Sequence, residues 1–181
     1  GLKPLAGDAV IVTFGDSLTA GTGAEETESY PAILAKLTGR TIINAGKPGE
    51  TTVDGLQRLP DILAGHPPGL LIVCEGGNDM LNQIPDTAIV ANLRSMIRMA
   101  QERDWQVVLI GAPRPAILLA TADFYRTLAR DCAIPCENTI IASLLSKPTL
   151  KSDQIHCNAE GYQRMAEAIK ALLVRTGAIA P

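Results

Sequence analysis

Residues 9 to 23 read AVIVTFGDSLTAGTG, an apolar run that ends at a glycine and gives way to a polar, glycine-rich turn. An apolar run without alternation is typical of a strand that is buried on both faces of a sheet. Similar short runs occupy residues 41–44, 70–74 and 106–110, and a weaker one lies near residues 133–137. Stretches with helical periodicity separate these runs. This alternation predicts an α/β fold, a doubly wound parallel sheet of five strands inside a three-layer α/β/α sandwich.

The segments between the strands carry signals of helix starts and ends. Residues 29–37 have Pro31 in the first turn and Gly39 beyond the end, whereas Pro60 is expected to bend or restart a helix over residues 51–64. Asp86 is expected to cap a long helix that buries one face, made of Ile89, Leu93, Met96, Ile97 and Ala100. Three further helices are expected over residues 122–132, through Ile141 and Leu145, and from Asn158 to just before Gly177.

Length and composition restrict the class of protein. The chain has 181 residues, of which 46% are hydrophobic, and it is predicted to form one domain over residues 1–181. A net charge of −3 disfavours a nucleic-acid partner, and the apolar runs are too short to form a transmembrane segment. Aromatic residues make up only 3%, so a platform that stacks bases or sugars is not expected. The sequence leaves the oligomeric state open, with a monomer favoured.

Ligands of doubly wound sheets bind beyond the carboxyl ends of the strands, so residues at this edge are candidates for a site. Four polar segments are expected there, namely residues 15–21, 44–52, 76–79 and 153–156. Together they supply a hydroxyl, an imidazole, carboxylates, an amide side chain and free backbone N–H groups. These are the groups that acyl transfer requires.

Ser17 is the candidate nucleophile, because a turn directly after a buried strand exposes its Oγ. A serine hydroxyl needs a base to take its proton. Of the two histidines, His66 precedes the third strand at the amino edge of the sheet, whereas His156 lies at the carboxyl edge. Asp153 is expected to accept a hydrogen bond from Nδ1 of His156, which leaves Nε2 free for Ser17.

The candidate oxyanion donors are the N–H of Ser17, the N–H of Gly49 and the side-chain amide of Asn78. Gly49 suits this role because a residue without Cβ lets a ligand approach the backbone closely. Each segment by itself has an ordinary structural explanation, since Asp16 and Asp79 can be turn formers that bind local backbone. The prediction of a site depends on all four segments lying at one edge of one sheet.

These motifs resemble those of the SGNH hydrolases, also called the GDSL esterase/lipase family. The resemblance covers nearly the whole chain. In residues 15–18 it implies Ser17 as the nucleophile, and in residues 153–156 it implies His156 and Asp153 as the rest of a catalytic triad. In residues 44–52 it implies Gly49 as the oxyanion glycine, and in residues 76–79 it implies Asn78 as the oxyanion asparagine. Gly46 is a second candidate for the oxyanion glycine, and Gly49 is favoured because Glu50-Thr51-Thr52 follows it as in similar proteins. Within the family, the chain resembles small bacterial arylesterases and multifunctional acyl thioesterases most.

The resemblance implies a flavodoxin-like sheet and a serine hydrolase that uses neither a cofactor nor a metal. It implies that Ser17 attacks an ester or thioester carbonyl, that His156 acts first as base and then as acid, and that water releases the acyl group. Proteins of this kind are often exported, so a periplasmic, secreted or lipoprotein form is expected, and a cytoplasmic one stays open. The absence of an initiator Met fits the removal of a leader and equally fits a cloning boundary.

Apolar side chains after the third and fourth strands are candidates to line an acyl groove. The candidate substrate-binding residues are Asp79, Met80, Ile84, Pro113, Ile117 and Leu118. The alternative is that residues 117–119 pack into the core. Because these candidates are mostly aliphatic, a small acyl ester or thioester of short-to-medium chain length is favoured as the substrate. An acetylated carbohydrate, and hence an O-deacetylase of the same fold, is the alternative.

Two functions of other classes compete with ester hydrolysis. A flavodoxin-like domain would bind the phosphate of a flavin or nucleotide at residues 15–23. That function gives no role to Asp153 and His156, and no phosphate-binding glycine motif occurs. A catalytically silent binding domain would tolerate the loss of a triad residue, yet none is missing. The hydrolase is therefore favoured over both.

The four cysteines are not spaced as a disulfide framework or a standard zinc site. Cys74 ends an apolar run and is expected to be buried, whereas pairing of Cys132 with Cys136 stays open. Cys157 follows His156 at a position where similar proteins commonly have proline. We hypothesise that oxidation of this thiol affects the neighbouring base.

Overall fold

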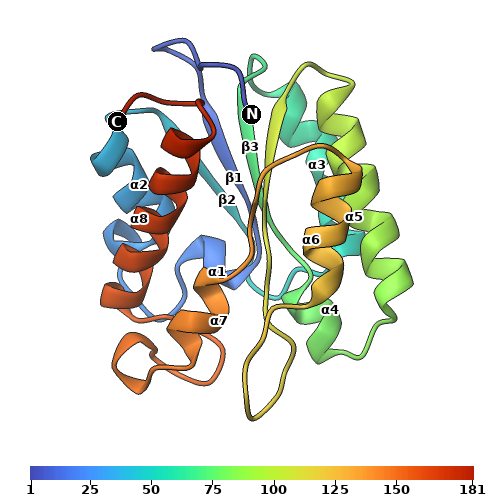
Figure 1. Ribbon diagram of the computed structural model, residues 1–181, viewed down its shortest axis with the longest axis vertical. Coiled ribbons are helices and arrows are strands. Elements are labelled where there is room, and N and C mark those ends of the chain that lie inside the picture. Colours follow the sequence, from blue (N-terminus) through green and yellow to red (C-terminus); the bar gives the residue numbers. More distant parts are fainter.

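The computed structural model describes residues 1–181 and has helices on both faces of one parallel sheet (Figure 1). The strands are β1 (Ile11–Gly15), β2 (Ile42–Gly46), β3 (Leu70–Cys74), β4 (Gln106–Ile110) and β5 (Cys136–Glu137). Their order in the sheet is β2-β1-β3-β4-β5, and every pair is parallel. This is the flavodoxin-like order, in which the direction of winding reverses between β1 and β3. The predicted three-layer sandwich with five strands is confirmed.

The helices connect the strands and cover both faces of the sheet. They are α1 (Ser17–Ala20), α2 (Tyr30–Thr38), α3 (Thr52–Ala64), α4 (Gly77–Leu81), α5 (Asp86–Gln101), α6 (Asp123–Asp131), α7 (Ile140–Leu145) and α8 (Ala159–Arg175), with 3₁₀ turns at Glu26–Glu28 and Pro148–Leu150. Helices α2 and α8 pack together on one face, and α3, α5 and α6 cover the other (Figure 1). None of the helices has the length and the apolar character that a membrane crossing requires.

Each face of the sheet has its own apolar core. Alternate residues of a strand point to opposite faces, so Leu70 and Ile72 of β3 pack on the α2–α8 side, and Leu71 and Val73 pack on the α3–α5 side. All four side chains are completely buried. Burial on both faces explains why this strand is a continuous apolar run in the sequence.

Local signals predicted most helix ends. Ser29 caps α2 and Gly39 ends it, and Asn158 caps α8. Helix α5 differs in its cap, because Pro85 occupies the N-cap position and Asp86 is the first helical residue. The five residues predicted to form its apolar stripe are all buried.

Two details of local structure differ from the prediction. Helix α3 runs through Pro60 without restarting. The φ angle of proline fits a helix, and the burial of Leu59 and Leu63 on the same helix offsets the lost hydrogen bond. The fifth strand is shorter than the predicted residues 133–137, because Ala133 adopts a φ of +54° and turns the chain before it can extend.

Candidate active site

Hydrogen bonds join segments that are far apart in the sequence at the carboxyl edge of the sheet, which faces down in Figure 1. The N–H of Lys47, after β2, donates to the carbonyl of Gly15 at the end of β1 over 2.8 Å. Asn78, in α4 after β3, donates from Nδ2 to the carbonyl of Glu50 over 2.9 Å. The segments after the first three strands are thereby held against one another.

Ser17, His156 and Asp153 form one continuous chain of hydrogen bonds. Nε2 of His156 lies 2.9 Å from Oγ of Ser17, and Nδ1 of His156 lies 2.8 Å from Oδ2 of Asp153. The structure therefore brings together the three side chains selected from the sequence. His66 lies in the connection between α3 and β3, at the opposite edge of the sheet, as predicted.

The surroundings of Asp153 keep its carboxylate charged. Desolvation acts to raise the pKa of Asp153, but the hydrogen bond from the His156 ring and those from the N–H groups of Ile155 and His156 outweigh it, so the pKa is lowered. The side chain of Asp153 is 54% exposed, whereas that of His156 is only 13% exposed. A carboxylate at this position orients the imidazole ring and stabilises its protonated form.

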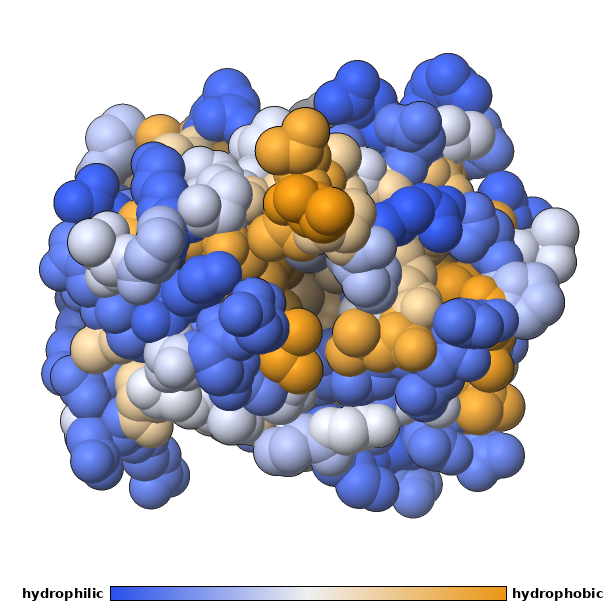
Figure 2. Space-filling view, turned by 90° about the horizontal axis from the view of Figure 1, so that it is seen from below, coloured by the Kyte–Doolittle hydropathy of each residue, from blue (hydrophilic) through white to orange (hydrophobic).

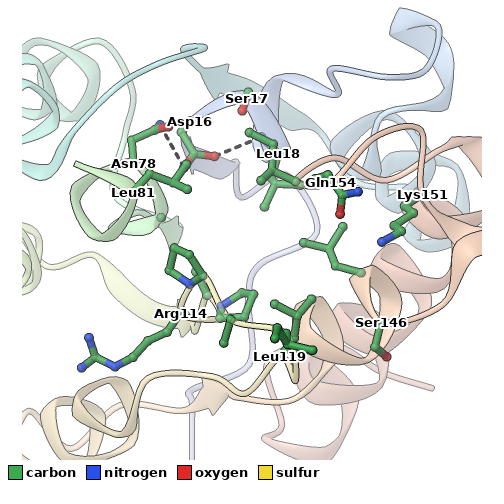
Figure 3. Close-up of a pocket in the computed structure, with 18 of the residues that line it drawn as sticks. Asp16, Ser17, Leu18, Asn78, Leu81, Arg114, Leu119, Ser146, Lys151 and Gln154 are labelled. Carbon is green, nitrogen blue, oxygen red and sulfur yellow. Dashed lines mark hydrogen bonds between the residues drawn. The ribbon is translucent and has the colours of Figure 1, made fainter. Parts of the chain in front are cut away.

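Asp16 caps the short helix that begins with Ser17. Its Oδ1 accepts a hydrogen bond from the N–H of Leu18 over 3.0 Å, and its Oδ2 lies 3.5 Å from Nδ2 of Asn78 (Figure 3). The side chain is buried, and desolvation raises the pKa of Asp16 from 3.8 to about 6 despite the opposing effects of the Leu18 bond and of His156. Asp16 is thus a turn former, as the sequence allowed, but one with a buried charge.

Asp16→Asn is expected to stabilise the protein increasingly as the pH rises from 4 to 8. A carboxyl whose pKa is raised from 3.8 to about 6 on folding contributes stability that is full below the unfolded value and is lost as the pH passes the folded value. Asparagine keeps the cap acceptor and carries no charge. The gain at pH 8 is about 3 kcal/mol at most, measured by urea unfolding at each pH. Exposed Asp8→Asn is the control, and a gain independent of pH would contradict the raised pKa.

The three candidate oxyanion donors have free or weakly used hydrogens. Ser17 is the first residue of α1, so its N–H has no acceptor within the helix. Neither this N–H nor the N–H of Gly49 donates a hydrogen bond to another protein atom. Gly49 has a φ of +79°, a conformation that favours glycine. Asn78 uses one hydrogen on Glu50, and its second has only the long contact to Asp16. The N–H of Gly46, the second candidate glycine, is already bound to Oδ1 of Asn44.

A cavity of about 580 Å³ begins beside Ser17. The chain after β4 (residues 112–119), one side of α4, the end of α7 and the turn before α8 line it. In Figure 3, Ser17 and Asn78 lie at the top of the cavity, and Leu119 and Ser146 lie at the bottom. Figure 2 shows this face of the molecule, with apolar side chains around the hollow. The nucleophile candidate therefore opens into a largely apolar space.

Three of the six candidate substrate-binding residues line this cavity, namely Pro113, Ile117 and Leu118. The alternative of core packing is wrong for Ile117 and Leu118, because the first is fully exposed and the second is 87% exposed. Leu119 lines the cavity and also packs against the core on the α2–α8 side.

The other three candidates, Asp79, Met80 and Ile84, do not line the cavity. Helix α4 presents Asn78 and Leu81, three residues apart, to the cavity and turns Asp79 and Met80 away from it. Asp79 is buried and accepts hydrogen bonds from the N–H and the hydroxyl of Thr52 over 2.8 and 2.7 Å, which caps α3. Met80 packs in the α3–α5 core, and Ile84 lies beyond the end of α4.

Sequence reasoning missed several residues of the site. The further side chains in the cavity wall include Leu81, Arg114, Ser146, Lys151, Gln154 and Ile155. Leu81 belongs to the apolar residues after the third strand that were expected to line a groove, although it was not one of the six named candidates. The buried carboxyl groups of Glu50 and Glu75, the first of them paired with the partly exposed Arg58, were also missed.

None of the four cysteines takes part in the hydrogen bonds of Ser17, His156 and Asp153. All four cysteines are free, and Cys74 is buried as predicted. Cys157 is completely buried in the α2–α8 core, and desolvation raises its pKa to about 12, so its thiol is poorly placed for the hypothesised oxidation. No group of three or more His, Cys, Asp or Glu side chains is arranged to hold a metal ion.

Comparisons with known proteins match most of the chain. The sequence model of the "GDSL-like Lipase/Acylhydrolase family" matches residues 13–164. An arylesterase of Vibrio mimicus is 29% identical over 176 residues, which cover 91% of this chain and 88% of that protein. Thioesterase 1/protease 1/lysophospholipase L1 of Escherichia coli K12 is 28% identical over 173 residues, with coverage of 91% and 83%. The crystal structure of AlinE4, described as an SGNH-hydrolase family esterase, has a TM-score of 0.72 at 30% identity and covers 95% of this chain and 98% of its own. The matched residues 13–164 include all four polar segments of the site.

Proposed function

The chain belongs to the GDSL-like lipase/acylhydrolase family and is a hydrolase of ester bonds, and on this basis we propose that it cleaves short-to-medium acyl esters or thioesters with Ser17 as nucleophile. The observation that carries the proposal is the chain of hydrogen bonds from Asp153 through His156 to Ser17, at the mouth of an apolar cavity. In a binding domain for a flavin or nucleotide, these hydrogen bonds would have no role.

The proposed reaction begins with proton transfer from Ser17 to His156. Oγ of Ser17 attacks the carbonyl carbon while Nε2 of His156, 2.9 Å away, takes the proton. The charge of Asp153 stabilises the imidazolium that forms. His156 then gives the proton to the leaving alcohol or thiol, and an acyl group remains on Ser17. Water, activated by His156 in the same way, hydrolyses this acyl-enzyme.

The negative charge that develops on the carbonyl oxygen needs donors that are already in place. In the proposed mechanism these are the N–H groups of Ser17 and Gly49 and the Nδ2–H of Asn78. Each such donor is worth roughly 3 kcal/mol of transition-state stabilisation, because it meets the charge only as the charge forms. The absence of protein acceptors for the first two N–H groups supports this assignment.

The wall of the cavity supports an aliphatic acyl group. Leu18, Leu81, Ile117, Leu118 and Leu119 supply apolar contacts, and no aromatic ring lines the cavity to stack on a sugar. The name of the Escherichia coli relative includes a thioesterase activity, which supports thioesters as a second substrate class. A small acyl ester or thioester is therefore favoured over an acetylated carbohydrate.

Hydrolysis of p-nitrophenyl esters from acetate to palmitate tests the proposal. We expect activity with an optimum at short-to-medium chain length. Ile117→Ser combined with Leu118→Ser is expected to lower kcat/KM for the octanoate ester about tenfold, because each lost apolar contact weakens acyl binding. The acetate ester has an acyl chain of only two carbons and offers little apolar surface to these side chains, so its kcat/KM is expected to change little.

Val53→Ser is the matched control, since Val53 is an exposed apolar side chain on the same edge that does not line the cavity. Equal losses of kcat/KM for the acetate and octanoate esters would show that Ile117 and Leu118 do not contact the acyl chain. Hydrolysis of acetate esters alone would favour acetylated carbohydrates, and no hydrolysis of any ester or thioester would overturn the proposed function.

An exported form, periplasmic or secreted, also belongs to the proposal. It rests on the resemblance to exported arylesterases and thioesterases. Separation of periplasmic, membrane and cytoplasmic fractions of the native cells, followed by detection with an antibody, would decide the location.

A further inference from the structure

Two buried carboxyl groups lie close together behind the segments that carry Gly49 and Asn78. The side chain of Glu50 is 0% exposed, and Glu75 is 1% exposed. Both carboxyl groups lie against Gly55 of α3. A Cβ atom at this glycine would be 3.1 Å from Oε1 of Glu50 and 3.2 Å from Oε1 of Glu75. The two groups therefore share one small buried space.

The partners of the two carboxyl groups are unequal. Arg58 donates from Nε and Nη2 to the two oxygens of Glu50 over 2.8 and 2.7 Å. Neither side-chain oxygen of Glu75 meets a hydrogen-bond donor. A buried carboxylate without donors is strongly disfavoured, and a second carboxylate beside it disfavours its charge further. A carboxylic acid, in contrast, carries its own donor, and Glu50 Oε1 is an acceptor at the same space.

We propose that Glu75 is a neutral carboxylic acid that donates a hydrogen bond to Glu50, and that this pair positions the oxyanion donors of the active site. The proposal rests on the proposed function. Glu75 touches no substrate and is a positioning residue, which acts through the backbone segments on either side of the pair.

The backbone around the pair shows how it acts. Glu50 directly follows Gly49, and its carbonyl accepts the 2.9 Å hydrogen bond from Nδ2 of Asn78. Glu75 directly follows β3, and its carbonyl accepts a 2.7 Å hydrogen bond from the hydroxyl of Tyr125. A hydrogen bond between the two side chains therefore ties the segment of Gly49 to the segment of Asn78. Ionisation of Glu75 would put two negative charges in this space and push the segments apart.

The charges around Glu75 agree with a neutral acid. Burial and the hydrogen bond with Glu50 raise the pKa of Glu75 well above neutrality, and the charges of Asp16 and Glu50 add to this effect. Arg58 is the one cation that acts against it, and its hydrogen bonds go to the carboxyl of Glu50 and the carbonyl of Ala45, none of them to Glu75.

Kinetics of Glu75→Leu and Glu75→Gln on the best ester test the proposal. Leucine fills the space without a donor, so we expect kcat to fall about 10- to 100-fold, a smaller loss than removal of an oxyanion donor, with KM changed less than about twofold. Glutamine keeps a neutral donor toward Glu50 and is expected to recover most of kcat. Met96→Ala is the matched control, because Met96 borders the same point near Gly55 but forms no hydrogen bond, and it is expected to lower Tm while kcat is retained.

Infrared spectroscopy provides a readout that needs no activity. At pH 7 the wild type is expected to show the carbonyl band of a protonated carboxylic acid that Glu75→Gln lacks, and Asp16 contributes equally to both proteins. No difference between the spectra would overturn the neutral acid. Glu75→Leu with wild-type kcat, or Glu75→Gln as slow as Glu75→Leu, would overturn the positioning role. A wild type that hydrolyses no ester, or does so without Ser17, would instead refute the proposed function and leave the infrared result to decide the state of Glu75.

Discussion

Ser17→Ala is expected to lower kcat for ester hydrolysis on the order of 10⁶-fold, with a residual rate that comes from substrate binding and the oxyanion donors alone. The reason is that no acyl-enzyme can form without Oγ, the atom that His156 Nε2 contacts at 2.9 Å. The measurement is kcat on the p-nitrophenyl ester that the wild type prefers. A fluorophosphonate probe is expected to label the wild type at Ser17 and to leave the variant unlabelled.

Ser146→Ala is the control for this loss, because Ser146 lines the same cavity near its other end. We expect its kcat to stay within about twofold of wild type, as for a surface substitution outside the reacting atoms. Activity that survives in Ser17→Ala, or that disappears in Ser146→Ala, would place the nucleophile elsewhere.

His156→Ala is expected to lower kcat nearly as much, on the order of 10⁵- to 10⁶-fold, because the Ser17 hydroxyl then has no base. Residues that act as one unit are not additive, so Ser17→Ala combined with His156→Ala is expected to be no slower than Ser17→Ala alone. The measurement is kcat of the three variants on one ester.

The chain supplies its own control for His156. His66, the other histidine, lies between α3 and β3 at the far edge of the sheet. His66→Ala is expected to keep wild-type kcat. A loss of activity in His66→Ala, or a further loss in the double variant at positions 17 and 156, would show that the base has been assigned to the wrong residue.

The sequence was sufficient for the sheet and for the residues at its carboxyl edge, because both depend on local patterns. A strand buried on both faces, such as β3, must be a continuous apolar run. The polar segments then follow from the rule that parallel strands end at one edge. Ser17, His156 and Asp153 needed no knowledge of packing, since each lies in a segment with a recognisable motif.

The wall of the cavity was predicted less well, because it depends on the directions of side chains. Gly76-Gly77-Asn78-Asp79 has the composition of a loop, yet residues 77–81 form α4 and turn Asp79 and Met80 inward. The apolar run around Ile117 resembles a buried strand, but Pro113 and Pro115 precede it and the structure leaves it exposed.

Glu75 carried no sequence signal at all. A glutamate between a strand and two glycines is expected at the surface. It lies against Gly55 of α3, and its carbonyl is bound by Tyr125 of α6, so its surroundings come from elements that are distant in the sequence. Only the assembled structure reveals that this carboxyl has no donor.

Ser17 and His156 are separated by 139 positions along the chain, and the turn that carries His156 leads directly into the last helix, α8. Helix α8 packs on α2 and also contacts the turn after α1, where the hydroxyl of Tyr162 donates to the carbonyl of Thr22 over 2.6 Å. On the proposed mechanism, a fragment of the chain that ends before Asp153 contains the nucleophile but neither its base nor the carboxylate that orients the base. Such a fragment is therefore expected to hydrolyse no ester, although it carries the complete Gly15-Asp16-Ser17-Leu18 motif.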